Sequence, residues 1–323
     1  MTPEENYLRA IRYDHPQWVP TIIPGATLNP PVTERPGEPV KDDFGVQWSL
    51  KEQAEGGTYP AHGGHTITDL ARWREQITIP DVDAMNWQLV RDQAAEHAPP
   101  GSGVMKRGFV EFGLFERSYL LLGMEEALIG YMTEPELMEE LVSAVADYKV
   151  ALIRRFVTEA GGMDVVWYGD DWGNQTQLFI PPDVWRRIIK PHTKRIYDCI
   201  HECGAIIDQH SCGRIDEIFA DMVEIGCDMW NPCQPCNDLA GLKRRFAGKI
   251  TFIGGIDSQF VLDRPGVTTD EVRAEVRRRI DELAAGGGYI AGPSHGVPYD
   301  EDIINAMYDE IDTYGRAFYA KNH

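Results

Sequence analysis

Hydrophobic and polar positions follow two different patterns along the chain. Up to about residue 100 the pattern is irregular: a short amphipathic segment at Glu4–Arg12 and an apolar run at Val19–Ile23 are followed by long stretches rich in proline and glycine. From about residue 103, short β-rich runs alternate with long amphipathic segments. We therefore expect an irregular part, residues 1–100, whose long loops cover a site, and a regular βα part, residues 101–323.

The regular part is expected to contain six strands and seven helices. The strands are Met105–Glu111, Asp164–Tyr168, Ala205–Gln209, Asp228–Trp230, Ile250–Ile253 and Tyr289–Gly292. The helices are Arg117–Tyr131, Pro135–Ala160, Pro182–Cys203, Ile215–Ile225, Asp238–Phe246, Thr269–Ala285 and Asp302–Phe318. Thr133 stands three residues before Glu136 and is expected to cap the second helix, and Pro182 suits a first turn.

Each strand after residue 160 is followed by a helix, which is the order of a parallel sheet or barrel. With a first strand at Val19–Ile23 there are seven such units, and residues 40–100 are expected to hide another. This number favours a single α/β domain, residues 1–323, with a (β/α)₈ TIM-barrel fold. A doubly wound open sheet stays the alternative, although no G-x-G-x-x-G motif or P-loop opens a helix.

Composition limits the partners of the protein. The 51 Asp and Glu residues exceed the 31 Lys and Arg residues and give a formal charge of −20, which repels a phosphate backbone, so we expect no nucleic-acid partner. No apolar run approaches the roughly 20 residues of a membrane helix, and the N-terminal segment is polar. A cytoplasmic protein without a membrane partner is expected.

Most polar groups of the C-terminal half stand directly after a predicted strand. Because the C-terminal ends of parallel strands meet at one mouth of a barrel, we expect a site there. The residues at these strand ends are Asp170, Asp171, Trp172, Gln175, His210, Cys212, Trp230, Asn231, Cys233, Gln234, Cys236, Asp257 and His295. Of these, Trp172, Gln175, Trp230, Asn231 and Gln234 are expected to contact a substrate.

His210 and Cys212 are separated by one residue, so an extended chain directs both side chains to the same side. Imidazole and thiolate are zinc ligands, and a catalytic zinc takes three protein ligands and keeps one position open. His295 is the expected third ligand. The alternatives are Cys233, Cys236, Asp170 and Asp171. Without a metal, His210 is a hydrogen-bonding histidine and Cys212 a small buried residue.

Three carboxylates are candidates for catalysis. Asp170 and Asp171 are adjacent and can raise each other's pKa, which suits a proton donor. Asp257 follows a glycine pair that allows the backbone close to a ligand. By contrast, Glu116 and Arg117 are interpreted as an internal ion pair.

Five segments in the same order resemble the uroporphyrinogen decarboxylase-like superfamily. They are FGLFERSYLLLG, DVVWYGDDWGNQTQLFIPPDVWRRIIKP, HSCGRIDEIFADMVEIGCDMWNPCQP, LKRRFAGKITFIGGIDSQ and GGGYIAGPSHGVP. The superfamily includes true decarboxylases and zinc-dependent, corrinoid-linked methyltransferases. The resemblance implies a (β/α)₈ barrel with its site at the strand C-termini.

The resemblance is closest to the methyltransferase branch. True decarboxylases carry an arginine-rich segment after the first strand, where this chain reads PTIIPGATLNPP without a basic residue. A substrate with many carboxylates would find no compensating charge there. The methyltransferases bind zinc through a His-x-Cys pair, matched by His210 and Cys212, and a later cysteine, whose position is occupied here by His295.

The resemblance implies methyl transfer between a small methylated substrate, such as a methyl ether or methylamine, or an acceptor, and the cobalt of a corrinoid. The cofactors implied are zinc and a corrinoid such as methylcobalamin, carried by a partner protein, and the superfamily also implies a homodimer. The alternatives are a metal-free decarboxylase acting on a tetrapyrrole or a smaller acid, and a non-catalytic barrel that serves as a binding protein.

Overall fold

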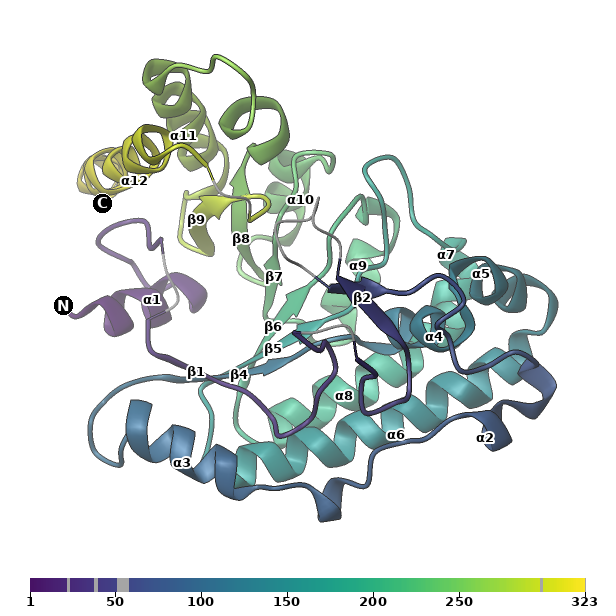
Figure 1. Cartoon of the computed structure of the whole chain (residues 1–323). Helices are drawn as coiled ribbons and strands as arrows, with labels where there is room; N and C mark the ends of the chain where they lie inside the picture. Colours follow the sequence, from purple (N-terminus) through teal and green to yellow (C-terminus); the bar gives the residue numbers. More distant parts are fainter. Residues whose placement is uncertain (22–23, 38–39, 51–57, 297–298, 323) are drawn as a thin grey trace. The chain divides into compact units, whose positions relative to one another are not determined.

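The computed structural model describes residues 1–21, 24–37, 40–50, 58–296 and 299–322 (Figure 1). The chain divides into two compact units. Unit 1 comprises Met1–Gly25, Trp172–Leu178 and Asp208–His323, and unit 2 comprises Ala26–Asp171 and Phe179–Ile207. Both units draw on the irregular and the regular parts of the sequence. The expectation of one domain stays a prediction.

Unit 2 contains the two long helices α6 (Pro135–Glu159) and α8 (Lys190–Glu202) and five strands of the described chain. Its strands are β1 (Ala26–Leu28), β2 (Trp48–Leu50), β3 (Thr58–Pro60), β4 (Lys106–Val110) and β5 (Val165–Gly169). Its helices are η2 (Leu70–Arg72), α2 (Trp73–Gln76), η3 (Val82–Ala84), α3 (Gln88–His97), α4 (Leu114–Leu122), α5 (Met124–Thr133), α6 (Pro135–Glu159), α7 (Pro182–Val184), η4 (Trp185–Ile189) and α8 (Lys190–Glu202). Helices α6 and α8 pack side by side (Figure 1).

Unit 1 begins with α1 and continues with the C-terminal βα repeats. Its strands are β6 (Ile206–His210), whose first two residues belong to unit 2, β7 (Met229–Asn231), β8 (Thr251–Ile256) and β9 (Tyr289–Pro293). Its helices are α1 (Pro3–Ile11), α9 (Asp216–Glu224), α10 (Leu239–Phe246), η5 (Ser258–Leu262), α11 (Thr269–Leu283) and α12 (Glu301–Asn322). A capping box between Thr268 and Glu271, which the sequence analysis missed, starts α11.

Seven strands of the described chain form one sheet in the order β1-β4-β5-β6-β7-β8-β9. The neighbours run parallel, for example β4 with β5 and β8 with β9. Strand β5 is buried at every position, as expected of a parallel strand covered on both faces. The parallel order with helices between the strands confirms the predicted α/β fold of the TIM-barrel type.

The N-terminal part differs from the prediction. The Pro20 carbonyl accepts a hydrogen bond from the backbone N–H of Ala291 in β9 (2.8 Å), but the first described strand is Ala26–Leu28 rather than Val19–Ile23, of which residues 22 and 23 lie outside the described chain. The expected extra unit in residues 40–100 is wrong for the described residues. They form α3 and the separate antiparallel pair β2–β3, while β1 pairs directly with β4.

Two predicted helices are interrupted. The segment Arg117–Tyr131 is two helices, α4 and α5, because Gly123 between them has φ +87°, a conformation that ends a helix. The segment Pro182–Cys203 starts at Pro182 as predicted, but it contains the π-helical turn η4, closed by a hydrogen bond from Lys190 N–H to the Trp185 carbonyl. Pro191 follows this turn and has no N–H to donate.

The predicted cap of α6 is also wrong. The side-chain hydroxyl of Thr133 donates to the Ile129 carbonyl in the last turn of α5, and α6 starts without a side-chain cap. No helix among the described residues is long and apolar enough to cross a lipid bilayer.

Candidate functional site

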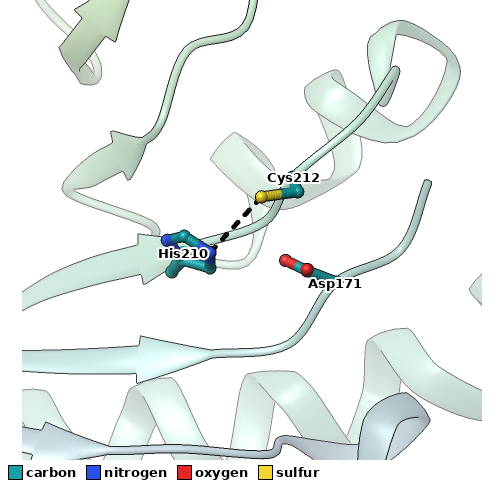
Figure 2. Close-up of side chains that lie close together, drawn as sticks. All are labelled: Asp171, His210 and Cys212. Atoms are coloured by element: carbon teal, nitrogen blue, oxygen red, sulfur yellow. Dashed lines mark hydrogen bonds between the residues drawn. The ribbon is translucent and has the colours of Figure 1, made fainter. Parts of the chain in front are cut away.

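The H-x-C motif lies at the C-terminal end of β6, where the sequence placed it. His210 is the last residue of the strand, and Cys212 follows after one residue. The two side chains turn toward each other: Cys212 Sγ lies 3.5 Å from His210 Nε2 (Figure 2). Both residues are half-buried. Side chains two residues apart on an extended chain point to the same side, and this brings the imidazole and the thiol together.

Two neighbouring polar side chains fix the tautomer of His210. Asn231 in β7 lies opposite His210, and its Oδ1 is 2.7 Å from His210 Nδ1. The Asn231 amide also donates through Nδ2 to the carboxylate of Asp208, which orients Oδ1 toward the ring. Because an amide oxygen only accepts, Nδ1 carries the proton and Nε2 keeps its lone pair. Asn231, expected to contact substrate, thus orients His210.

Asp171 completes a group of three possible metal ligands. Among the described residues, one ligand atom from each of Asp171, His210 and Cys212 lies within 4.8 Å of the other two (Figure 2). Asp171 is the last residue of a unit 2 segment, and the peptide bond to Trp172 joins it directly to unit 1. That bond holds the two Cα atoms about 3.8 Å apart. Asp171 was an alternative third ligand in the sequence analysis.

This set of side chains fits zinc. Oxygen, nitrogen and sulfur are all zinc ligands, and three of them leave one position open on a tetrahedral ion. Two ligands at ordinary zinc–nitrogen and zinc–sulfur distances lie about 3.6 Å apart. The 3.5 Å between Cys212 Sγ and His210 Nε2 agrees with this value. The hydrogen bond that His210 Nδ1 donates to Asn231 in the neighbouring strand is also what a metal-binding histidine requires.

His295, the expected third ligand, does not join this group of three. It is exposed after β9, and its backbone is fixed by Ser258: His295 N–H donates to Ser258 Oγ, whose hydroxyl donates to the His295 carbonyl. The structure instead places His295 on the wall of a neighbouring cavity.

Asp170 is buried and binds the start of α4. Its two carboxylate oxygens accept the backbone N–H groups of Leu114, Phe115 and Glu116 at 2.9–3.2 Å. These N–H groups have no partner within the helix, and a carboxylate there is stabilised by the helix dipole. Asp170, a candidate catalytic residue, therefore has a structural role as the cap of α4.

The loop after Cys212 is hydrogen-bonded to segment 172–178. Trp172 N–H donates to Ser211 Oγ (3.1 Å), and Arg214 N–H donates to the Asn174 carbonyl (2.7 Å). Gly213 has φ +81°, and a Cβ there would lie 2.2 Å from the carbonyl of Gly173. A glycine is thus required beside Cys212.

Both tryptophans expected to contact substrate are buried. Trp172 is 1% exposed and Trp230 is fully buried. Trp230 packs against Phe219 and Phe252, and its indole N–H donates to the Ser211 carbonyl. Their size and burial make them part of the core that supports the loop after β6.

Glu116, which the sequence analysis interpreted as a partner of Arg117, is a further acidic group close to Asp171. Glu116 lies near Asp171 and Asp170, and its Oε1 accepts a hydrogen bond from Tyr119 (3.3 Å). Burial, and then the charges of Asp171 and Asp170, raise the pKa of Glu116 well above its ordinary value. Glu116 lies in the first turn of α4 rather than at a strand end, so its sequence position favoured a structural role.

The expected ion pair between Glu116 and Arg117 is wrong. The buried Arg117 guanidinium pairs with Asp42 (2.9 Å) and Glu34 (3.2 Å), both from the irregular part of the chain. Buried Lys149 also pairs with Glu34 (2.7 Å). These buried charges attach the loop before β2 to α4 and α6.

Unit 1 contains a cavity of about 560 Å³ next to the loop that bears Cys212. Four of the predicted site residues line it together with Cys236: Gln175, Gln234, Asp257 and His295. Cys233 lies in the core instead, where burial raises the pKa of its thiol to about 12. A raised pKa keeps this thiol protonated, which disfavours it as a nucleophile.

Comparisons with known proteins agree with this fold. The sequence model of the family described as Uroporphyrinogen decarboxylase (URO-D) matches residues 117–314. Uroporphyrinogen decarboxylase 1, chloroplastic, of Oryza sativa subsp. japonica is 28% identical over 171 residues, which cover 51% of this chain and 38% of the relative. A uroporphyrinogen decarboxylase of Thermus thermophilus is 27% identical over 180 residues, covering 53% and 46%. The matches span less than half the length of these curated relatives.

A solved structure, a methyltransferase from Methanosarcina mazei, has a TM-score of 0.71 to this chain. It covers 97% of this chain and 99% of its own, with 15% sequence identity. At that identity the similarity shows the fold alone.

Proposed function

The chain belongs to the uroporphyrinogen decarboxylase (URO-D) family, a family of enzymes, and on this premise we propose that it is a zinc-dependent methyltransferase. The methyl group moves between a small methylated substrate, or an acceptor, and the cobalt of a corrinoid carried by a separate protein. Asp171, His210 and Cys212 are the proposed zinc ligands.

One observation carries the proposal: the three donor atoms lie within 4.8 Å of one another, with the His210 lone pair directed at the group. A buried thiol or a core histidine needs no such arrangement. The orientation of His210 by Asn231 and Asp208 is the kind of support that metal-ligating histidines have. The Methanosarcina mazei methyltransferase supports the choice of branch only through its fold.

Zinc with an open position supplies Lewis acidity toward the heteroatom that carries the methyl group. The carbon–heteroatom bond would break with its electron pair on the heteroatom, which would take a proton from water, and the methyl group would pass to the reduced corrinoid of the partner protein. If the methylated corrinoid is the donor instead, a thiolate acceptor would take the methyl group and the corrinoid would return to its reduced form.

The residues of this chain have distinct parts in the proposed reaction. Asn231 and Asp208 keep the proton on Nδ1 of His210, and Gly213 keeps the Cys212 loop against segment 172–178. Gln175 and Gln234, whose side chains are hydrogen-bonded to each other (2.9 Å), present an amide wall to the substrate.

A metal-free decarboxylase is the second candidate, because the curated relatives are uroporphyrinogen decarboxylases. The lining of the 560 Å³ cavity opposes a substrate with many carboxylates, since it includes Asp257 and Asp263 and no lysine or arginine of the described chain. Such a substrate would have to bury its charges beside like charges. The decarboxylase proposal therefore requires a smaller acid.

Metal analysis of purified variants tests the site. We expect about one zinc per chain in the wild type, and loss of that zinc in Cys212→Ala and Asp171→Ala. His295→Ala is the matched control, because His295 lies outside the group of three and its loss leaves zinc bound. Zinc lost in His295→Ala but kept in Asp171→Ala would overturn the proposed ligand set.

A spectroscopic assay tests the reaction. Zinc-loaded protein is incubated with reduced cob(I)alamin and candidate methyl donors, and the methylcob(III)alamin spectrum is followed. We expect methylation in the wild type and none in Cys212→Ala. Carbon dioxide release from a carboxylic acid by chelator-treated protein, with no methylation from any donor, would favour the decarboxylase instead.

Cytoplasmic location and a homodimer are parts of the same proposal. A metal-binding Cys212 has to remain a thiol, which a reducing compartment ensures. Light scattering of the purified protein, alone and with a corrinoid protein, measures both the oligomeric state and the proposed partnership.

A further inference from the structure

The cavity in unit 1 contains a carboxylate oxygen that no described residue satisfies. Asp257 lines the cavity and is only 8% exposed. Its Oδ1 accepts the backbone N–H of Phe260 (2.9 Å), which fixes the carboxylate at the wall, while Oδ2 accepts no hydrogen bond from the described chain. This oxygen is open to the cavity, where a hydrogen-bond donor or a cation of a ligand can reach it.

The rest of the lining suits a cation. A second carboxylate, Asp263, belongs to the wall, and no lysine or arginine of the described residues does. Phe260 also lines the cavity and is 70% exposed, which is unusual for a ring of this size. The face of an aromatic ring attracts a cation, and alkylammonium ions are the ligands that carboxylates and aromatic rings bind together.

The cavity adjoins the loop that bears Cys212. Gln234 is part of the wall, and its Oε1 accepts the backbone N–H of Gly213 (2.8 Å), the residue after Cys212. The Gln175 side chain donates to the same oxygen (2.9 Å). All of these residues belong to unit 1. The wall of the cavity is thus hydrogen-bonded to the residue that follows the proposed ligand Cys212.

We propose that this cavity binds the cationic end of the substrate, an alkylammonium group, between Asp257 and Phe260. This inference rests on the proposed function, because methyl transfer would take place at the other end of the substrate. Binding of the cationic end itself requires no metal. It narrows the substrate class to small methylated compounds, or acceptors, that carry a positively charged nitrogen.

Calorimetric titration with a matched pair of probes tests the inference. Choline carries a trimethylammonium group, and 3,3-dimethylbutan-1-ol has the same shape without the charge. We expect choline to bind at least about tenfold more tightly than the neutral alcohol. Asp257→Asn keeps an oxygen for the Phe260 N–H and is expected to remove most of this preference. Phe260→Leu is expected to weaken choline binding by about threefold.

Asp14→Asn is the control, because Asp14 is exposed in unit 1 and does not line the cavity, yet its replacement removes the same formal charge. Unchanged choline binding in Asp14→Asn with a loss in Asp257→Asn supports the inference. Equal binding of the two probes, or an equal loss in both variants, overturns it.

The failure of this inference can be told apart from failure of the proposed function. The titration is repeated with Cys212→Ala, which is expected to bind no zinc but to keep its affinity for choline. If the wild type binds choline but neither binds zinc nor transfers a methyl group, the cation site is supported and the methyltransferase proposal is rejected. If it binds zinc and transfers methyl groups from neutral donors but shows no preference for choline, the methyltransferase proposal is supported and the cation site is rejected.

Discussion

Replacing Asn231 tests whether zinc binding at the proposed site depends on the tautomer of His210. Asn231→Leu removes the oxygen that lies 2.7 Å from His210 Nδ1 and keeps a side chain of similar size. Without this acceptor the ring proton can move to Nε2, the atom that faces Cys212. A protonated Nε2 cannot bind a metal, so the substitution acts on metal affinity without changing any of the three proposed ligands.

The expected effect on zinc affinity follows from this hydrogen bond. Loss of the partner that orients a metal-ligating histidine costs about 10- to 100-fold in affinity. That range corresponds to about 1.4–2.7 kcal/mol, similar to the contribution of one hydrogen bond to a charged group. The substitution also removes the Asn231 donor from buried Asp208, so we expect a further loss of about 1–3 kcal/mol in the free energy of unfolding.

The assay is a competition titration of zinc against a chromophoric chelator, under conditions where circular dichroism shows both proteins folded. Thr251→Val is the matched control. Thr251 is buried in the neighbouring strand β8, and its hydroxyl donates to the Ile11 carbonyl (3.4 Å), so its loss affects stability but not His210. We expect wild-type zinc affinity in Thr251→Val.

A folded Asn231→Leu protein with the zinc affinity of the wild type would refute the reasoning. An equal loss of affinity in Thr251→Val would show that general destabilisation, and not the orientation of the ring, sets the affinity.

Three further predictions concern the stability of the fold and the different roles of Asp170 and Asp171. Asp170→Asn is expected to lower the free energy of unfolding by about 1–2 kcal/mol with zinc content unchanged, whereas Asp171→Asn is expected to lower zinc content. Urea unfolding and metal analysis of both variants check this. Asp42→Ala leaves buried Arg117 short of one partner and is expected to cost about 3–5 kcal/mol in urea unfolding. Burial lowers the pKa of Lys243 to about 7, so between pH 7 and about 10.5 the unfolded chain binds this proton more strongly than the folded protein. The free energy of unfolding therefore rises with pH in this range, by at most about 1.4 kcal/mol per pH unit. Urea unfolding at pH 7, 8 and 9 is expected to show this rise in the wild type and not in Lys243→Met.

The sequence predicted the part of the site that local geometry determines. His210 and Cys212 are close because an extended chain repeats every two residues and because a strand end faces the mouth of a parallel sheet. Both rules apply to any sequence with this pattern. The burial of β5 and the positions of most strands followed from the same kind of pattern.

Contacts between segments that are distant in the sequence could not be predicted from the local sequence pattern. Arg117 pairs with Asp42 and Glu34 rather than with its neighbour Glu116, because the fold brings the irregular loop before β2 against α4. Nothing in the local sequence separates these partners from other acidic residues. The break at Gly123 was different, since a glycine followed closely by two acidic residues is a visible sign of a new helix start.

The choice between Asp170 and Asp171 shows how the structure resolves an ambiguous pair. Neighbouring side chains on an extended chain point to opposite sides, so only one of two adjacent carboxylates can face the start of α4. Asp170 takes that place, where three backbone N–H groups bind it. Asp171 does not cap α4, although its charge acts on Glu116 in that helix, and the hydrogen bond between Trp172 and Ser211 attaches the chain just after Asp171 to the loop of Cys212. Because Asp170 is engaged as the cap of α4, Asp171 is the carboxylate that we propose as the third metal ligand in place of His295.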